Sequence, residues 1–128
     1  MVTIRDAFPG FSVDDIDAAR EFYGTKLGLP VDDAGMGALR ISLPSGQAVF
    51  VYPKPNHEPA TFTILNFLVD NVDTAVDKLK STGIKFEQYD LPDIKTDERG
   101  IARDTGGPAM AWFKDPAGNI LSVLQRAD

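Results

Sequence analysis

The sequence contains no cysteine among its 128 residues, and it has only one histidine and one tryptophan. A chain without cysteine can form no disulfide, no thiolate nucleophile and no cysteine-based zinc site. Positive charge is also scarce: the sequence has 13 Lys and Arg against 19 Asp and Glu, which gives a net charge of −6. We therefore expect no nucleic-acid partner, since phosphate binding depends on a basic face.

Long hydrophobic runs are absent too. No apolar stretch approaches the length that crosses a bilayer, and the first residues, MVTIRDAFPG, lack the basic and apolar regions of a signal peptide. We therefore expect a cytoplasmic protein with no membrane partner. The 43% share of hydrophobic residues and the chain length predict one globular domain with a buried core.

An internal repeat is the most informative feature that is present. FSVDDIDAA at residues 11–19 returns as FLVDNVDTA at residues 67–75, an offset of 56 positions. A strand is expected before each copy, over roughly 3–13 and 61–69, and apolar residues at helical spacing follow each copy. In each copy an acidic or amide residue is placed to cap the helix and a glycine to end it: Asp14 or Asp15 with Gly28, and Asp70 or Asn71 with Gly83.

Three strand-like runs follow each predicted helix. They are LPVDD, ALRISL and QAVFVYP in the first half, and IKFEQYD, PAMAWFK and NILSVLQ in the second. Each half is thus predicted to be a βαβββ module, and the fold class to be α+β, with two modules related by pseudo-two-fold symmetry around a curved-sheet cleft. We expect a single domain made of module one (about 3–53), a proline-rich linker (about 53–60) and module two (about 61–126).

The residues that carry a family resemblance are VDDIDAAREFYGTKLGL near the start and WFKDPAGNILSVLQ near the end. With the repeat, they make the chain resemble the vicinal oxygen chelate superfamily, over about residues 4 to 126. That superfamily holds glyoxalase I, the extradiol dioxygenases and the bleomycin-resistance proteins. The resemblance implies a ligand cleft on the concave side of the sheets and, as in many members, a homodimer.

Metal-dependent members of this superfamily hold a divalent ion with His or Glu from four strand positions. The resemblance places these positions at Phe8, Val51, Ile64 and Ser122, none of which has a metal-binding side chain. We therefore expect no metal and no other cofactor. The single histidine, His57, lies in the proline-rich linker, where we interpret it as an exposed polar residue.

With no metal, the cleft is expected to be apolar and aromatic. Such a pocket suits a planar or amphipathic small molecule. For each of these residues taken alone a place in the core is favoured, whereas the cleft as a whole is expected to hold a ligand. Val51 or Phe50 could stand where Tyr52 is assigned. The predicted ligand-binding residues are Phe8, Tyr52, Ile64, Trp112 and Ser122.

Three functions stay open at this point. The first is a non-catalytic binder of the bleomycin-resistance type. The second is a metal-independent isomerase or lyase that relies on Tyr52, Ser122 or a loop carboxylate, and the third is a scaffold without a ligand. A buried ionisable pair would favour the enzyme, and because the sequence indicates none, the prediction is the metal-independent binder, with the isomerase or lyase as the alternative.

Two further features of the sequence bear on binding. Arg40 could anchor an anion, but strand alternation favours a solvent-facing position. The polar loop 91–107 is long enough to be functional. Its charged residues are equally consistent with a lid over a ligand and with a solvated loop: Glu98, Arg99, Arg103 and Asp104.

Overall fold

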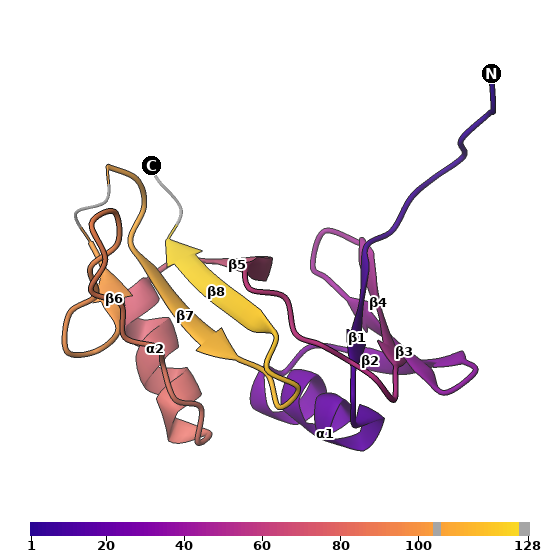
Figure 1. Ribbon diagram of the computed structural model, residues 1–128, viewed down its shortest axis with the longest axis horizontal. Helices are drawn as coiled ribbons and strands as arrows, with labels where there is room; N and C mark the ends of the chain where they lie inside the picture. Colours follow the sequence, from indigo (N-terminus) through magenta and orange to yellow (C-terminus); the bar gives the residue numbers. More distant parts are fainter. Residues whose placement is uncertain (104–105, 126–128) are drawn as a thin grey trace. The chain divides into compact units, whose positions relative to one another are not determined.

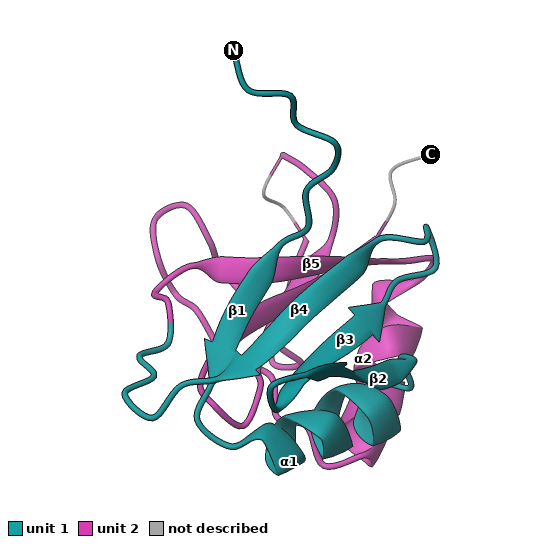
Figure 2. Ribbon diagram, turned by 90° about the vertical axis from the view of Figure 1, so that its right-hand side faces the viewer, with its two compact units in different colours: residues 1–59 teal, residues 60–128 magenta. Residues whose placement is uncertain are grey.

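A computed structural model describes residues 1–103 and 106–125 of the chain. The chain divides into two compact units, Met1–Pro59 and Ala60–Asp128 (Figures 1 and 2). Each unit contains a four-stranded mixed sheet and a helix, so the fold is α+β and is built from two similar modules, as predicted. That the two units make up one domain stays a prediction. Within the described residues, no helix has the length and hydrophobicity needed to cross a bilayer.

Unit 1 follows the predicted order of strand, helix and three strands. Its sheet runs β1-β4-β3-β2, with β1 parallel to β4 and the other pairs antiparallel. Its elements are β1 (Gly10–Val13), α1 (Ile16–Arg20), the π-helical turn η1 (Glu21–Lys26), β2 (Val31–Gly35), β3 (Ala38–Ser42) and β4 (Ala48–Pro53).

Unit 2 repeats this topology. Its sheet runs β5-β8-β7-β6, again with one parallel pair, β5 with β8. Its elements are β5 (Thr63–Val69), α2 (Val72–Ser81), β6 (Ile101–Ala102), β7 (Met110–Lys114) and β8 (Ile120–Gln125).

Both helices begin at the residues that the repeat predicts. The Asp15 carboxylate accepts the backbone N–H of Ala18 at 3.1 Å, and the Asn71 side chain accepts that of Thr74 at 2.9 Å. Each side chain satisfies an N–H group that the first helical turn would otherwise leave unpaired. Asn71 stands 56 positions after Asp15, so the repeated sequence encodes a repeated helix start.

The core of unit 1 lies between α1 and one face of its sheet. The rings of Phe11 on β1 and Tyr23 lie 5.8 Å apart, which places the Phe11 side of the sheet against the helix. Alternation along the strands then brings five nearly inaccessible residues to this face: Val13, Leu39, Ile41, Val49 and Val51.

The core of unit 2 is equivalent. Gln125 at the end of β8 accepts the backbone N–H of Val72 at 3.2 Å and so ties that strand to the start of α2. Buried Val72 and Val76 of α2 belong to the same core, because α2 contacts β7 and β8. The buried residues on the sheet face that shares the side of Gln125 are Ile101, Ala111, Phe113, Leu121 and Val123.

The predicted strand over 3–13 is too long. Regular pairing begins at Gly10, and the last bond before it runs from the N–H of Phe50 to the carbonyl of Pro9. Because β4 starts at Ala48, residues 1–7 lie beyond the end of their neighbour strand. Together with Phe8 they form an exposed N-terminal arm (residues 1–8) that extends away from the sheet of unit 1 (Figure 1).

The predicted strand IKFEQYD over 84–90 is also wrong. This segment makes only isolated bridges, from Phe86 to Phe113 and from Asp90 to Lys95, and the N–H of Glu87 bonds the carbonyl of Trp112 at 2.8 Å. The chain then turns through a small hairpin in which Tyr89 and Thr96 are bonded. The strand that pairs regularly with β7 at the edge of the sheet is β6, which lies within the predicted loop 91–107.

Candidate functional site

Each sheet has one face that its own helix does not cover, which we call the helix-free face. In unit 1 the strand register brings Gly10, Phe50 and Arg40 side by side across β1, β4 and β3 on this face. In unit 2 the register brings Asn66, Ser122 and Trp112 side by side across β5, β8 and β7. The strands concerned are topologically equivalent, so these two rows of three occupy equivalent positions.

Ser122 and Asn66 form the polar centre of the row in unit 2. Their side-chain oxygens lie 2.6 Å apart, with the Ser122 hydroxyl donating to the Asn66 amide oxygen. Ser122 is fully buried and Asn66 is exposed. The hydroxyl of Ser122 thus donates its hydrogen bond to a neutral amide. Because an amide is not a base, this pair cannot activate the hydroxyl as a nucleophile.

Trp112 forms the aromatic end of the same row. It is 7% exposed, and Tyr89 packs edge-on against it with ring centroids 5.4 Å apart. Burial raises the pKa of Tyr89 above its usual value, and the negative charge of Glu87 raises it further against the opposing effect of Lys114. Tyr89 therefore stays a neutral hydroxyl at physiological pH and can donate a hydrogen bond.

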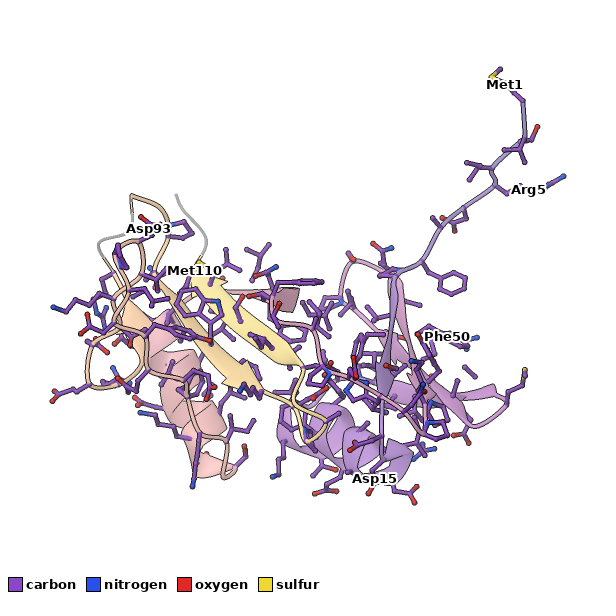
Figure 3. The ribbon with its side chains drawn as sticks, in the orientation of Figure 1. Met1, Arg5, Asp15, Phe50, Asp93 and Met110 are labelled. Atoms are coloured by element: carbon purple, nitrogen blue, oxygen red, sulfur yellow. The ribbon has the colours of Figure 1, made fainter. Side chains whose placement is uncertain are left out.

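The other sequence-predicted residues occupy the same two faces or their margins. Ile64 is half-buried on β5, where the register with β8 shifts by one residue. Phe8 precedes β1 and is 66% exposed, and its ring lies 5.6 Å from that of Phe50, which Figure 3 labels on its strand. Tyr52 is 41% exposed on the helix-free face of unit 1.

The structure brings Trp112 and Ser122 together as direct cross-strand neighbours, and Phe8 into contact with Phe50. It does not bring Val51 to either group. Val51 faces the helix and is inaccessible, so the expectation that Val51 could line a cleft is wrong. The equivalent of Ser122 in unit 1 is Phe50, one residue away.

Sequence reasoning missed Asn66, Tyr89 and the central place of Phe50. The internal repeat of the sequence could have identified two of these, Asn66 and Phe50. Aligning AVFVY of β4 with ILSVL of β8 places Phe50 opposite Ser122, and the 56-residue offset pairs Asn66 with Gly10. Tyr89 had no such signal, because its contact with Trp112 depends on the hairpin after residue 88.

His57 does not match the expectation of an exposed linker residue. It is half-buried, and its Nδ1 lies 2.6 Å from the hydroxyl of Ser12 on β1. Ser12 pairs with Tyr52 in the register and so lies on the helix-free face of unit 1. The single histidine therefore contributes a hydrogen-bonding group to that face.

The charged part of the loop 91–107 is turned toward α2. Arg99 bonds both Asp73 and Asp77, and Arg103 bonds Asp73 at 2.6 Å and Asp97 at 3.3 Å. The hydrogen bond from Arg103 is the main reason that the pKa of Asp73 lies below its usual value. Glu98 is exposed, and Asp104 lies outside the described residues.

Asp97 anchors the turn that leads into β6. Partial burial would raise its pKa, but backbone N–H groups of Ile101 and Arg99, both at 2.9 Å from its Oδ1, outweigh that effect and lower it. The network therefore holds residues 97–103 against the helix, and neither arginine points to the Trp112 row.

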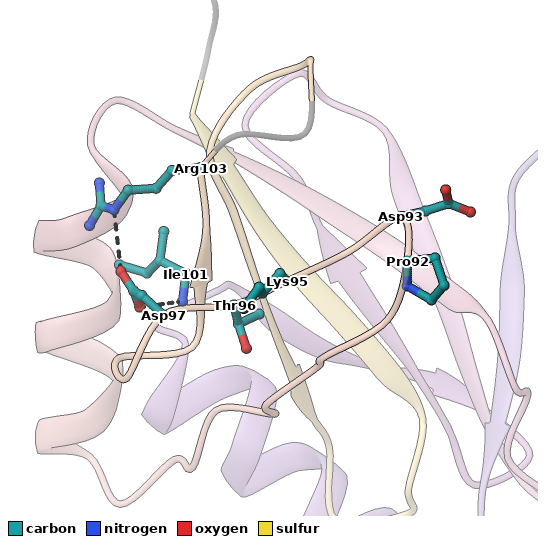
Figure 4. Close-up of a pocket in the computed structure, with 7 residues that line it drawn as sticks. All are labelled: Pro92, Asp93, Lys95, Thr96, Asp97, Ile101 and Arg103. Carbon is teal, nitrogen blue, oxygen red and sulfur yellow. Dashed lines mark hydrogen bonds and ion pairs between the residues drawn. The ribbon is translucent and has the colours of Figure 1, made fainter.

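A cavity of about 430 Å³ opens beside this network (Figure 4). Charged side chains of both signs line it, and none of the sequence-predicted ligand residues does. Its volume is in the range of small-molecule sites, but four of its seven lining residues are charged, whereas such sites carry only a few polar groups. The lining residues are Pro92, Asp93, Lys95, Thr96, Asp97, Ile101 and Arg103.

The metal positions implied by the resemblance do not fit a divalent ion. With Phe50 in place of Val51, the four side chains are Phe8, Phe50, Ile64 and Ser122, which offer one hydroxyl already bonded to Asn66. Proteins hold divalent transition-metal ions mainly with carboxylate, imidazole or thiolate groups, and these four side chains offer none. Over residues 1–103 and 106–125, no group of three or more His, Cys, Asp or Glu side chains is placed to hold a metal ion.

Comparison with known proteins identifies one family. The model of the Glyoxalase/Bleomycin resistance protein/Dioxygenase superfamily matches residues 7–123. No curated protein matches the sequence.

Solved structures of the same fold are similar over nearly the whole chain. The fosfomycin resistance protein FosX from Listeria monocytogenes has a TM-score of 0.71 and 12% identity, with 98% of this chain and 96% of that chain covered. TnmS3, an antibiotic binding protein from Streptomyces sp. CB03234, has a TM-score of 0.64 and 20% identity, with coverage of 98% and 100%. A glyoxalase/dioxygenase from Nostoc punctiforme has a TM-score of 0.66, 19% identity and full coverage of both chains.

Proposed function

The chain belongs to the Glyoxalase/Bleomycin resistance protein/Dioxygenase superfamily, and on that premise we propose that it is a metal-independent binding protein for a small aromatic or amphipathic molecule. The residues proposed to contact it lie on or beside the helix-free face of one sheet or the other. The proposed contact residues are Phe8 and Tyr52 on unit 1, and Ile64, Trp112 and Ser122 on unit 2.

The row of Asn66, Ser122 and Trp112 is the observation that supports this proposal best. An indole next to a hydrogen-bonded hydroxyl and an amide combines apolar area with a few fixed polar groups, which is typical of small-molecule sites. Because the partner of Ser122 is a neutral amide and Tyr52 is exposed, binding is favoured over an isomerase or lyase reaction.

The side chains at the implied metal positions support metal independence. Phenylalanine and isoleucine cannot coordinate a cation, and a lone neutral hydroxyl competes poorly with water for one. Stabilisation of chelator-treated protein by nickel, zinc, iron or manganese, at a site that Ser122→Ala removes, would contradict this part of the proposal.

A homodimer is the assembly that we propose. The N-terminal arm exposes Val2, Ile4 and Phe8 by 82%, 77% and 66%, and a second copy of the chain could cover these side chains.

Two solved relatives that resemble the fold are named for antibiotic resistance or binding, which supports an organic small molecule as the ligand.

The single tryptophan makes the binding proposal directly testable. A neutral aromatic probe, N-phenyl-1-naphthylamine, is expected to quench Trp112 emission in a saturable way and to raise the melting temperature. Trp112→Phe is expected to weaken binding several-fold by calorimetry, because it removes ring area from the row.

Phe113→Leu is the matched control. Phe113 is the next residue on β7 but faces α2, so this change is expected to cost about 1 kcal/mol of stability and to leave binding unchanged. If Phe113→Leu weakens binding as much as Trp112→Phe, the helix-free face is not the site.

A further inference from the structure

Among the described residues, Arg40 differs in its partners from Arg20, Arg99 and Arg103. Arg20, Arg99 and Arg103 each pair with carboxylates. Arg40 lies in the middle of β3, and no ion pair of its guanidinium is found within residues 1–103 and 106–125. Its cross-strand neighbour Asp32 is not close enough to bond it. Arg40 therefore presents five donors to solvent on the helix-free face of unit 1.

Aromatic side chains adjoin this free cation. Phe50 lies directly across from Arg40 in the β3–β4 register, and the ring of Phe8 rests 5.6 Å from that of Phe50. Gly10 faces Phe50 from the other side and has no side chain to cover it. An aromatic ring bound on Phe50 would thus have a guanidinium at one edge.

A hydrogen-bonding pair completes this face. Ser12 and His57 are joined at 2.6 Å, and Ser12 is the register partner of Tyr52, two residues along β4 from Phe50. The face therefore presents a cation, aromatic rings and hydroxyl groups in one area of the sheet.

We propose that the ligand carries an anionic group, a carboxylate or a sulfonate attached to an aromatic ring, and that Arg40 binds it. Arg40 stands where Trp112 stands in unit 2, so the same sheet position is aromatic in one unit and cationic in the other. Guanidinium donors match two oxygens of a planar anion at once. In a chain of net charge −6, attraction for an anion must come from such a local group. This inference rests on the proposed function and defines its ligand class.

Two fluorescent probes of similar shape separate the charge from the ring. 8-Anilinonaphthalene-1-sulfonate carries the anion, and N-phenyl-1-naphthylamine is its uncharged counterpart. Arg40→Gln is expected to weaken sulfonate binding about tenfold, the equivalent of one charge-assisted hydrogen bond, and to change binding of the neutral probe less than twofold. Arg40→Lys keeps the charge without the forked geometry and is expected to fall between.

Arg20→Gln is the matched control, because it removes the same charge from α1 of unit 1, away from the sheet face. Circular dichroism and melting temperature establish that each variant is folded. If Arg40→Gln weakens both probes equally or neither, or if Arg20→Gln has the same effect, the anion inference is overturned while binding of the neutral probe still supports the proposed function. If the native protein binds neither probe, the proposed function itself fails, and the ligand class with it.

Discussion

Asn66→Ala is expected to destabilise the protein more than Ser122→Ala, although both remove the same hydrogen bond. Ser122 is fully buried, so without Asn66 its hydroxyl loses its acceptor away from water. Leaving a buried polar group unsatisfied costs about 1–3 kcal/mol. Asn66 is exposed, so without Ser122 its amide is solvated, and the loss is only the net value of the bond, about 1 kcal/mol.

The double variant makes the comparison decisive. When both side chains are replaced, no buried polar group is left unpaired. The double variant Asn66→Ala with Ser122→Ala should therefore lose less free energy of unfolding than Asn66→Ala alone. Urea unfolding of the native protein and the three variants gives the four free energies, provided that the slope with denaturant is unchanged. A cost for Ser122→Ala that equals or exceeds that of Asn66→Ala, or a double variant equal to the sum of the two, would refute the reasoning.

Two further predictions concern the ion pairs and the arm. Arg103 is the main cause of the lowered folded-state pKa of Asp73, so the stability that Asp73 contributes is present above the unfolded pKa of about 3.9 and is lost as pH falls through the folded value. Asp73→Asn should therefore flatten the pH dependence of the free energy of unfolding below about pH 4. An unchanged pH dependence below about pH 4 would contradict this. Deletion of residues 1–7 should shift sedimentation from dimer toward monomer, whereas Arg5→Ala should not; a dimer that survives the deletion excludes the arm as the interface.

Local signals in the sequence were enough to predict the repeated part of the fold. Asp15 and Asn71 cap the helices through contacts only three residues away, and such contacts are encoded in short segments. The strand β6 was missed because Ile101 and Ala102 offer two residues of pattern and depend on pairing with β7. The early end of pairing at Gly10 depends on where β4 begins, which the sequence of β1 does not contain.

The candidate site was predicted less completely, and the reason is strand register. AVFVYP is apolar on both faces, so periodicity alone could not decide whether Val51 or its neighbours face the helix, and a slip of one residue exchanges the faces. The register decides which face Val51 is on, because Val51 pairs with Phe11 and Phe11 packs against Tyr23 on the helix side. His57 was misjudged because its partner Ser12 lies 45 positions earlier in the chain.

The equivalence of the two sheets gives positions on β1, β4 and β3 counterparts on β5, β8 and β7, and this makes the chain its own reference for protein engineering. Each of three backbone positions already carries two natural side chains: Gly10 and Asn66, Phe50 and Ser122, Arg40 and Trp112. One row carries a charge and the other is neutral and polar, so exchanging residues between the two rows offers a way to redesign what the protein recognises.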